Sequence, residues 1–499
     1  MSAPSPVVFI GAGPGDPGLL TLRGQRVLAE AEVVVVDADV PLAVLESVAA
    51  RTERVSVGDD PMSVSRSAVP TLLVARATDG LRVARVVAGD GGDVAAEAAA
   101  VVGAGVAVEV VPGVGGAVAS ALYAGIPLVT PDACASTLIL DTTAPGRLDW
   151  RRLGRGAETL LIRVGDATIE AVIGGLLGAG RRVDAPAALV SDGGTLRQRV
   201  VSGRLDALLG EARRQGVAYP AWLVAGDAVG WRARLLWLER RPLYGRRVLV
   251  TRPRSQAARF GALLEAYGAE VVAVPTIRLE PPDDWRPLDE AIARLTAFRW
   301  VIFTSANGVA AFRERLTRAG RDARALAGAG LAAIGPETAE ALRRGGLEPE
   351  VVPPEYRAEG LVETLRPYVE AGSEVLLVRA AEAREVLPRA LQALGGRVTD
   401  APAYRTVPAK EGADHVVELL EARAVDVVTF TSSSTVRGFM ALLAPDEVRR
   451  LLAGVVLAAI GPVTAATVAE YGLEVAVIPR EYTVGALAEA IAARFADSD

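Results

Sequence analysis

The chain has 499 residues, enough for about three domains, since a domain commonly takes roughly 150 residues. It contains one histidine, one cysteine and one lysine (His415, Cys134 and Lys410), and the other 53 of its 54 basic residues are arginines. This composition excludes a disulfide framework, a Cys/His zinc cluster and a lysine-rich nucleic-acid patch, and no metal site is expected. The formal net charge of −6 argues against broad electrostatic binding of nucleic acid or acidic lipid.

No segment of the chain has the pattern of a secretory signal or a membrane span. Residues 1–16 lack a cationic region followed by a long apolar run. Residues 110–131 carry no charge, and their length alone could span a bilayer, but Pro112, Pro127 and four glycines interrupt them. A buried turn and helix fits this segment better than a membrane helix. We therefore expect a cytoplasmic protein that binds neither membrane nor nucleic acid.

Short apolar runs rich in β-branched residues alternate with Ala/Leu/Arg-rich stretches along the whole chain. Strands that are apolar on both faces and separated by helices predict parallel sheets covered on two sides. The predicted fold class is therefore α/β from end to end. The runs are 7–10, 33–36, 108–111, 248–250, 301–303, 375–378 and 427–430.

The first 240 residues begin with VVFIGAGPGDPGLL at 7–20, a strand that enters a glycine-rich turn and then a helix. Such a turn alone is compatible with any nucleotide-like ligand, or with a tight turn only. The segments that follow are AEVVVVDADV at 31–40, EVVPGVGGAVASALYAGIPLV at 109–129, GGTLRQRVVSGRL at 193–205 and PAWLVAGDAVGWR at 220–232. In this order, residues 5–240 resemble the tetrapyrrole methyltransferases, particularly uroporphyrinogen-III C-methyltransferase, a two-lobed α/β family that binds S-adenosylmethionine between its lobes.

The resemblance implies an active-site mouth at the glycine-rich turn and a methyl-donor site beside it. The mouth would comprise Gly11, Gly13, Gly15, Asp16 and Pro17, and the donor would lie near Gly89, Asp90, Pro112, Gly113 and Thr195. The resemblance also implies a homodimer through this domain.

Three segments depart from the family pattern. AGDGGDVAAEA at 88–98 is shorter than the family's Gly-Gly-Asp-Pro-Phe run and lacks its aromatics and arginine. Residues 57–68 lack the usual Lys-Arg, His and Gln, and Arg-Val-Gly at 163–165 replaces Tyr-Met-Gly. We therefore expect a degenerate methyltransferase domain that binds S-adenosylmethionine weakly or serves as a scaffold.

A domain boundary is predicted within WRARLLWLERRPLYGRR at 231–247, which holds six arginines around a Pro-Leu-Tyr-Gly turn. A solvated linker is the preferred interpretation of this charge run, and a polyanion site is the alternative. The predicted domains are 5–240 and 245–499, with 241–247 as the linker between them.

The second half of the chain contains an internal repeat. GRRVLVTRPR at 245–254 matches GSEVLLVRAA at 372–381, and FTSANGV at 303–309 matches FTSSSTV at 430–436, both at a separation of 127. A longer match joins 331–361 to 457–487, with Ile-Gly-Pro-x-Thr in both copies. Residues 245–499 are therefore two copies of one α/β unit, and ligands of such pairs usually lie in the cleft between them.

Both copies place hydroxyl groups where an apolar strand ends and a helix is expected to begin. Serine and threonine at that position cap the helix, whose free backbone N–H groups then face any bound anion. Each motif alone can be explained by capping, but together they predict a two-sided cleft lined with hydroxyl and amide donors, suited to a polycarboxylate. The candidate substrate-binding residues are Thr304, Ser305, Thr338, Ser432, Ser433, Thr464, Tyr482 and Thr483.

Positions that differ between the copies are candidates for specialised roles. Tyr404, in APAYRTVP, stands where the first copy has Ile277. It lies where the chain leaves one half for the other, so its phenol either faces the cleft or packs as a half-buried boundary residue. Arg252 and Arg379 occupy equivalent strand ends and are candidates to pair substrate carboxylates, with a purely structural role as the alternative.

The order of VLVTRP, FTSANGV, AAIGPETA, APAYRT, FTSSST, AAIGPVTA and REYTVGAL makes residues 245–499 resemble uroporphyrinogen-III synthase over the full length of that family. The resemblance implies two similar α/β lobes joined by a two-stranded connector, lobe one being 245–278 plus 405–499 and lobe two 279–404. The implied reaction needs no cofactor. Hydroxymethylbilane loses its hydroxyl, its last pyrrole ring is inverted through a spiro intermediate, and the macrocycle closes as uroporphyrinogen III.

That reaction requires mainly that a flexible polyanion be held in one geometry, together with weak acid assistance to the departing hydroxyl. Tyr404 would be the proton donor or water-bridging group. A phenol with a pKa near 10 is a weak acid, so its effect should be modest.

Three hypotheses follow from the two resemblances. The first is a uroporphyrinogen-III synthase fused to an inactive methyltransferase-like domain. The second is a bifunctional enzyme that uses S-adenosylmethionine to make precorrin-2. The third is a non-catalytic tetrapyrrole binder or regulator, which an added DNA-binding domain would favour, and none is visible in the sequence.

Overall fold

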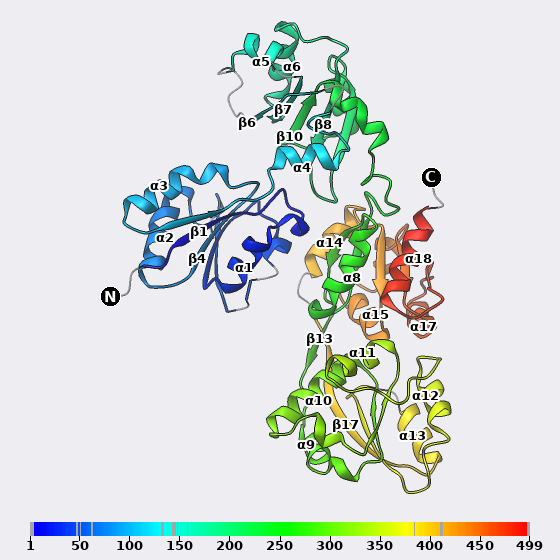
Figure 1. Ribbon diagram of the computed structural model, residues 1–499. Coiled ribbons are helices and arrows are strands. Elements are labelled where there is room, and N and C mark those ends of the chain that lie inside the picture. Colours follow the sequence, from blue (N-terminus) through cyan, green and yellow to red (C-terminus); the bar gives the residue numbers. More distant parts are fainter. Residues whose placement is uncertain are drawn as a thin grey trace. The chain divides into compact units, whose positions relative to one another are not determined.

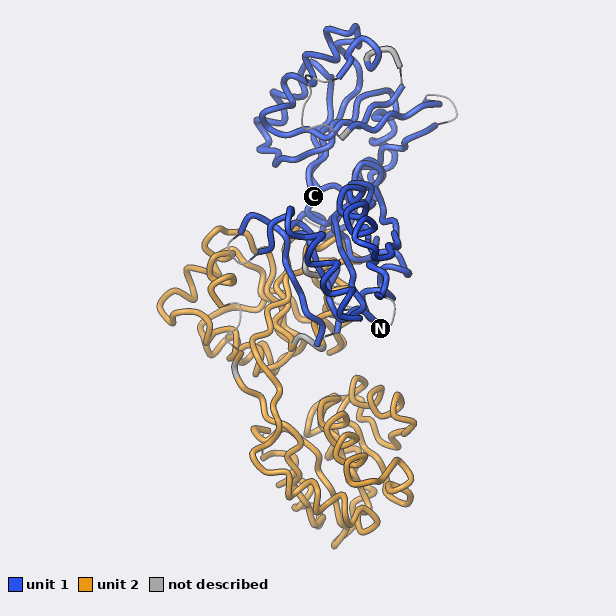
Figure 2. Tube along the Cα trace, turned by 90° about the vertical axis from the view of Figure 1, so that its left-hand side faces the viewer, with its two compact units in different colours: residues 1–245 blue, residues 246–499 orange. Residues whose placement is uncertain are grey.

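The computed structural model divides into two compact units, Met1–Gly245 (unit 1) and Arg246–Asp499 (unit 2), coloured separately in Figure 2. It describes residues 4–45, 48–49, 51–60, 63–130, 134–141, 146, 148–156, 158–383, 385–409 and 413–496. The single lysine, Lys410, and two positions of the 57–68 segment lie outside the described residues.

The first lobe of unit 1 is a parallel sheet with strand order β3-β2-β4-β1-β5 and helices on both faces (Figure 1). Every residue of β2 and β4 is buried, as expected for strands covered on two sides. The elements are β1 (Val7–Gly11), α1 (Leu22–Glu30), β2 (Val33–Asp37), β3 (Glu53–Val57), α2 (Val69–Thr78), β4 (Val83–Val87), α3 (Ala95–Gly103) and β5 (Val108–Val111), and α4 (Gly116–Tyr123) follows.

The second lobe of unit 1 is a mixed sheet of order β6-β7-β10-β8-β9, so the expectation of parallel sheets throughout is wrong here. Only β6 and β7 pair in parallel, and the other three strand pairs are antiparallel. For β8 and β9 the reason is the short loop that joins them, which forces an antiparallel pair without a helical crossover. The elements are β6 (Thr137–Asp141), α5 (Trp150–Gly156), β7 (Thr159–Val164), α6 (Ile169–Gly178), β8 (Pro186–Ser191), β9 (Arg199–Arg204), α7 (Leu208–Gln215) and β10 (Ala221–Ala225).

Lobe one of unit 2 is built from the two ends of that unit. Its parallel sheet has the order β12-β11-β18-β19, so the first strand of the unit pairs with a strand from the last third of the chain. The elements are β11 (Arg247–Val250), α8 (Arg254–Ala266), β12 (Glu270–Ala273), α14 (Ala413–Glu421), β18 (Val427–Phe430), α15 (Ser433–Met440), α16 (Val448–Leu451), β19 (Val456–Ala459), α17 (Pro462–Ala469) and α18 (Val484–Ala496).

Lobe two of unit 2 contains the chain between those ends, in a sheet of order β13-β17-β16-β14-β15. The long strand β17 runs parallel to β16 and then pairs antiparallel with β13 over Arg405–Pro408. The elements are β13 (Ile277–Glu280), α9 (Arg286–Ala293), β14 (Trp300–Phe303), α10 (Ala306–Arg318), β15 (Gly330–Ala333), α11 (Pro336–Arg344), α12 (Ala358–Leu365), β16 (Glu374–Ala380), α13 (Val386–Ala393) and β17 (Arg397–Pro408).

The sequence repeat is reproduced in the packing of the two lobes. Phe303 and Phe312 make an edge-to-face contact with ring centroids 5.3 Å apart, and their repeat equivalents Phe430 and Phe439 do the same at 5.5 Å. Each pair ties the strand before a candidate site to the helix after it. The two copies therefore place their strand ends and helix starts alike.

The described part of the uncharged segment, residues 110–130, forms the end of β5, helix α4 and the chain after it. In the part of the chain that the structure describes, no helix is both long and apolar enough to cross a membrane.

Candidate functional sites

In unit 2, serine side chains cap the helices that follow the central strands. Ser305 Oγ accepts a hydrogen bond from Gly308 N of α10 at 3.0 Å. Ser432 does the same for α15, with Thr435 completing a reciprocal capping box. The expected capping is therefore present, and it engages these hydroxyls in the free protein.

A second pair of helices begins without such caps. Gly335 precedes α11 and Gly461 precedes α17, and neither helix start has a side-chain capping bond. A tyrosine lies over each glycine, because a Cβ added there would be 3.3 Å from Tyr356 or Tyr482. Both tyrosines are partly exposed. Each lobe thus presents a helix N-terminus without a side-chain cap, whose backbone N–H groups attract anions, and a tyrosine lies beside it.

The remaining hydroxyl candidates are internal. Thr338 and Thr464 are each 4% exposed, so they lie under the helix starts instead of facing solvent. Ser433 Oγ accepts a hydrogen bond from Thr467 at 2.7 Å, and Thr483 Oγ caps α18 by accepting from Ala486 N at 3.1 Å. Thr304 is half-buried at the end of β14.

Tyr404 lies in β17 beside the start of α10. Its hydroxyl donates to Ser305 Oγ at 3.0 Å, and the phenol also hydrogen-bonds the side chain of Asn307. Burial raises the pKa of the phenol, while the bonds to Ser305 and Asn307 oppose that rise. Tyr404 is therefore a neutral donor held at the first turn of a helix.

The two equivalent arginines have different surroundings. Arg379 is held within its own lobe by Asp400, whose Oδ1 lies 2.8 Å from its Nε, and by Glu385 at 2.6 Å. Arg252 contacts Gln256 at 2.8 Å and, among the described residues, a single carboxylate, that of Glu337 in the other lobe, at 3.4 Å. Arg252 is thus the less neutralised of the two.

The sequence interpretation missed three polar residues at this interlobe contact: Gln256, Asn307 and Glu337. Gln256 Nε2 of lobe one donates to Asn307 Oδ1 of lobe two at 2.8 Å, beside the Arg252–Glu337 pair. The signal that could have revealed them is the repeat itself, because all three differ from their counterparts. Those counterparts are Ala383, Ser434 and Val463.

In unit 1, three loops meet at the carboxyl ends of β1, β4 and β5. Gly13 and Gly89 exchange two backbone hydrogen bonds of 2.9 and 2.8 Å, and Gly113 N donates to Asp90 O at 3.1 Å. A Cβ on Gly113 would collide with the carbonyl oxygens of Gly11 and Gly89, so the loop packing requires glycine there. The chain connections after β1 and β4 lead toward opposite sides of the sheet. The crevice that this leaves outside the carboxyl ends of the two strands is where α/β proteins usually bind ligands.

Most polar side chains of this crevice already have internal partners. The Asp16 carboxylate accepts from Gly18 N at 2.7 Å, at the start of the short helix that Pro17 begins, and from Tyr123 OH at 2.8 Å. The pKa of Tyr123 is raised, mainly because the phenol is buried and also because of its hydrogen bond to the Asp16 carboxylate and the charge of that carboxylate. Thr195 Oγ donates to Asp192 O at 2.7 Å.

Parts of the crevice still fit a ligand that approaches the backbone. An atom added as Cβ on Gly89, which has a φ of 73°, would meet no described atom within 4 Å. Thr195 lies against Gly15 of the glycine-rich turn, so both lobes of unit 1 contribute. In the loop that carries Thr195, the buried Gln198 Nε2 lacks a hydrogen-bond partner. Pro112 and Asp90 are exposed at the rim.

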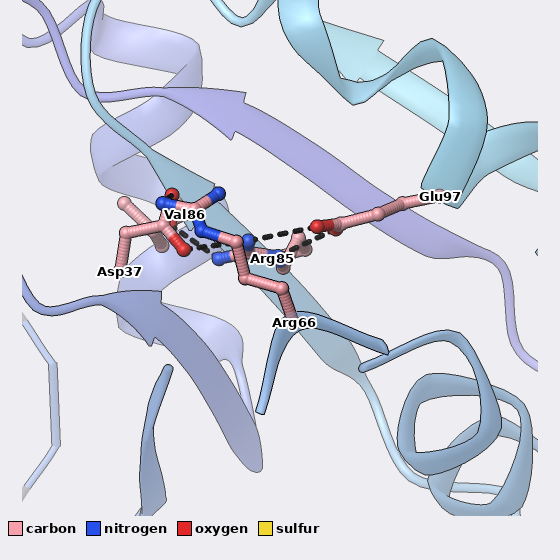
Figure 3. Close-up of polar contacts among 5 residues, drawn as sticks. All are labelled: Asp37, Arg66, Arg85, Val86 and Glu97. Atoms are coloured by element: carbon pink, nitrogen blue, oxygen red, sulfur yellow. Dashed lines mark hydrogen bonds and ion pairs between the residues drawn. The ribbon is translucent and has the colours of Figure 1, made fainter. Parts of the chain in front are cut away.

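An ion-pair network lies behind this crevice (Figure 3). Arg85 of β4 is completely buried, and its guanidinium contacts Asp37 Oδ1 at 2.6 Å and Glu97 Oε2 at 2.8 Å. It also donates to Val86 O, and Arg66 approaches Asp37 at 3.4 Å. Burial alone would lower the pKa of Arg85, but the bonds to Glu97 and Asp37 raise it overall. The network fixes α3 and the end of β2 to the central strand.

No three His, Cys, Asp or Glu side chains among the described residues gather closely enough to hold a metal ion.

Comparisons with known proteins match a different family to each of the two compact units. A family model for tetrapyrrole (corrin/porphyrin) methylases matches residues 6–209, and a model for uroporphyrinogen-III synthase HemD matches 258–489. A uroporphyrinogen-III synthase of Synechococcus elongatus is 38% identical, over 50% of this chain and 96% of that protein. A uroporphyrinogen-III C-methyltransferase of Bacillus subtilis is 32% identical over 70% and 73%, respectively. The porphyrin biosynthesis protein HemD of Ruminiclostridium josui is 29% identical over 94% of both chains.

Proposed function

Because the chain belongs to the uroporphyrinogen-III synthase family and carries a tetrapyrrole methylase domain before the synthase, we propose that unit 2 cyclises hydroxymethylbilane to uroporphyrinogen III while unit 1 completes no methyl transfer. The observation that carries the first part is the set of polar contacts between the two lobes of unit 2. There the Tyr404 phenol is bonded to Ser305 and Asn307, and Asn307 accepts a hydrogen bond from Gln256 of the opposite lobe.

Catalysis would proceed by positioning and by weak acid assistance. The uncapped starts of α11 and α17, with Tyr356 and Tyr482 beside them, would receive substrate carboxylates from the two sides. Tyr404, directly or through a water, would donate a proton to the departing hydroxyl, which leaves as water. The resulting azafulvene cation is attacked by the last pyrrole ring, the spiro intermediate rearranges, and the proton lost when the ring regains aromaticity restores the phenol.

The second part of the proposal rests on what the unit 1 crevice lacks. Its carboxylate at Asp16 and its hydroxyl at Thr195 are both engaged internally, and the aromatic and basic residues that the family pattern places nearby are missing. S-adenosylmethionine, when bound, supplies an electrophilic methyl group. Gly89, Asp90 and Thr195 would hold it, since the open space beyond Gly89 fits a ligand that contacts the backbone.

A bifunctional enzyme is the second candidate, and the intact loop packing around Gly113 favours it.

One assay of the full chain separates the two candidates. We expect hydroxymethylbilane to give uroporphyrinogen III at the same rate with and without S-adenosylmethionine, and no precorrin-2. Precorrin-2 formation together with micromolar binding of S-adenosylmethionine in calorimetry would establish the bifunctional enzyme. Spontaneous uroporphyrinogen I as the sole product would refute both candidates.

We also propose that unit 1 forms a homodimer. The support is an apolar groove of about 270 Å³ whose lining includes the exposed side chains of Leu122, Leu235 and Trp237. Exposed apolar patches of this kind commonly mark protein interfaces. Leu235→Glu should convert the dimer to a monomer in sedimentation experiments, whereas Leu22→Glu, at another exposed apolar residue of unit 1, should leave it unchanged. A monomeric wild-type protein at micromolar concentration would contradict the proposal.

A further inference from the structure

Four positions at which the two repeats of unit 2 differ lie together in the structure. Gln256, Asn307, Glu337 and Tyr404 all lie at the contact between the lobes, in a chain of polar contacts that includes Arg252. Their repeat counterparts are Ala383, Ser434, Val463 and Ile277, which lack these amide, carboxylate and phenol groups. Four polar groups that are present in only one copy of the repeat therefore lie around or near one arginine.

Arg252 differs from its equivalent Arg379 in how its charge is balanced. Arg379 has two carboxylates of its own lobe, Asp400 and Glu385, whereas the positions equivalent to them around Arg252 are alanines, Ala273 and Ala258. Arg379 thus has a structural role within its lobe. The charge of Arg252 is not balanced by a carboxylate at either equivalent position, so it can pair with one from outside its lobe.

The hydrogen bonding of Arg252 is incomplete. Its side chain is only 10% exposed, and its buried Nε has no hydrogen-bond partner within the described part of the chain. A guanidinium binds a carboxylate best with two parallel N–H···O bonds, and Glu337 supplies one long contact of 3.4 Å from an exposed position. Buried donors without partners are uncommon in folded proteins. The Arg252 guanidinium can therefore bind a carboxylate with two hydrogen bonds, whereas Glu337 makes one long contact with it.

We propose that Arg252 forms an interlobe subsite for a substrate carboxylate, in which Glu337 occupies the place of that carboxylate until substrate replaces it. The proposal rests on the synthase function of unit 2 and deepens it. An acetate or propionate side chain of hydroxymethylbilane takes both the Nε and the Nη2 of Arg252, and Glu337 returns to water. Gln256 stays bonded to Asn307, which bonds Tyr404, so binding of the carboxylate and placement of the phenol occur at one lobe contact.

Glu337→Gln tests this exchange, because removing a competing carboxylate should strengthen binding of an anionic substrate. Exposed ion pairs change an equilibrium by no more than about fivefold, so we expect a two- to fivefold lower KM for hydroxymethylbilane. The Kd for uroporphyrin III, a stable polycarboxylate, should fall by the same factor in the full-length protein. Glu340→Gln makes the same charge change one turn along α11 and should leave both constants unchanged.

Arg252→Gln should raise both constants by about tenfold to a hundredfold, since it removes a charge-assisted pair of hydrogen bonds. The KM and Kd of Arg252→Lys should lie between those of wild type and Arg252→Gln, because lysine keeps the positive charge but lacks the paired N–H donors of a guanidinium. Thermal unfolding of each variant separates binding from stability. If Glu337→Gln does not tighten uroporphyrin binding, or Arg252→Gln does not weaken it, the subsite is refuted while the synthase function stands. If the wild-type chain makes no uroporphyrinogen III, the proposed function fails, and the uroporphyrin binding data still decide the subsite.

Discussion

Tyr404→Phe is expected to lower the kcat for hydroxymethylbilane about ten- to a hundredfold and to raise the share of uroporphyrinogen I. General acid groups contribute about 10²- to 10⁴-fold, and a phenol whose pKa is raised further by burial belongs at the low end of that range. The isomer ratio reports the second effect, because spontaneous closure without ring inversion gives isomer I. Product chromatography after oxidation measures both quantities.

The matched control is Tyr368→Phe, which removes an exposed phenol hydroxyl from the same lobe and should change neither quantity. Unchanged rate and isomer ratio in Tyr404→Phe would remove Tyr404 from the mechanism. A fall in thermal stability without any kinetic change would assign it to packing alone.

The raised pKa of Tyr404 also determines the pH at which its contribution disappears. The unfolded chain loses this proton near pH 10, so the stability that the neutral phenol contributes is complete below that pH and declines as the pH rises through the folded-state pKa. An alkaline limb of kcat caused by Tyr404 therefore lies above pH 10. The same limb should be absent from Tyr404→Phe.

Arg85→Leu is expected to destabilise unit 1 by about 3–5 kcal/mol, the usual cost of leaving half of a buried ion pair unpaired. Asp37 is only 4% exposed and would keep only the 3.4 Å contact with Arg66, while Glu97 would lose its bidentate partner. Because the two units can unfold separately, hydrogen exchange of peptides from β2 and β4 is a better measurement than a global melting curve.

Arg23→Leu is the control for this substitution. It breaks an exposed pair with Glu109 in the same lobe, and such pairs contribute at most about 1 kcal/mol. Equal losses in the two variants would show that the network in Figure 3 has no special weight.

Much of the fold could be predicted from the sequence because its signals are local. Runs such as residues 33–36 are apolar on both faces, which indicates a covered parallel strand, and the internal repeat indicates two similar lobes. The mixed sheet of the second lobe of unit 1 could not be predicted in this way. β8 and β10 are as apolar as parallel strands, and only the short loop after β8 determines the antiparallel direction of β9.

Some features of the candidate sites can be recognised in the sequence, and others cannot. The glycine-rich turn and the Ile-Gly-Pro helix starts are recognisable because backbone geometry demands particular residue types there. Gln256 is only four residues from Arg252, but Glu337 belongs to the other lobe, so no local spacing indicates that Arg252 and Glu337 meet. The sequence also makes Arg252 and Arg379 look equivalent, whereas the carboxylates around them make them different.

The strand order β12-β11-β18-β19 has a consequence for synthesis on the ribosome. β11 is a central strand, but its neighbour β18 begins at Val427, so the sheet of lobe one cannot be completed until nearly the whole chain has emerged. Lobe two, whose strands lie between those points, has all its pairing partners available much earlier. During translation the first strand of unit 2 therefore remains an open, apolar edge while the inserted lobe forms beside it, and a chain cut short before β18 would expose that edge to aggregation.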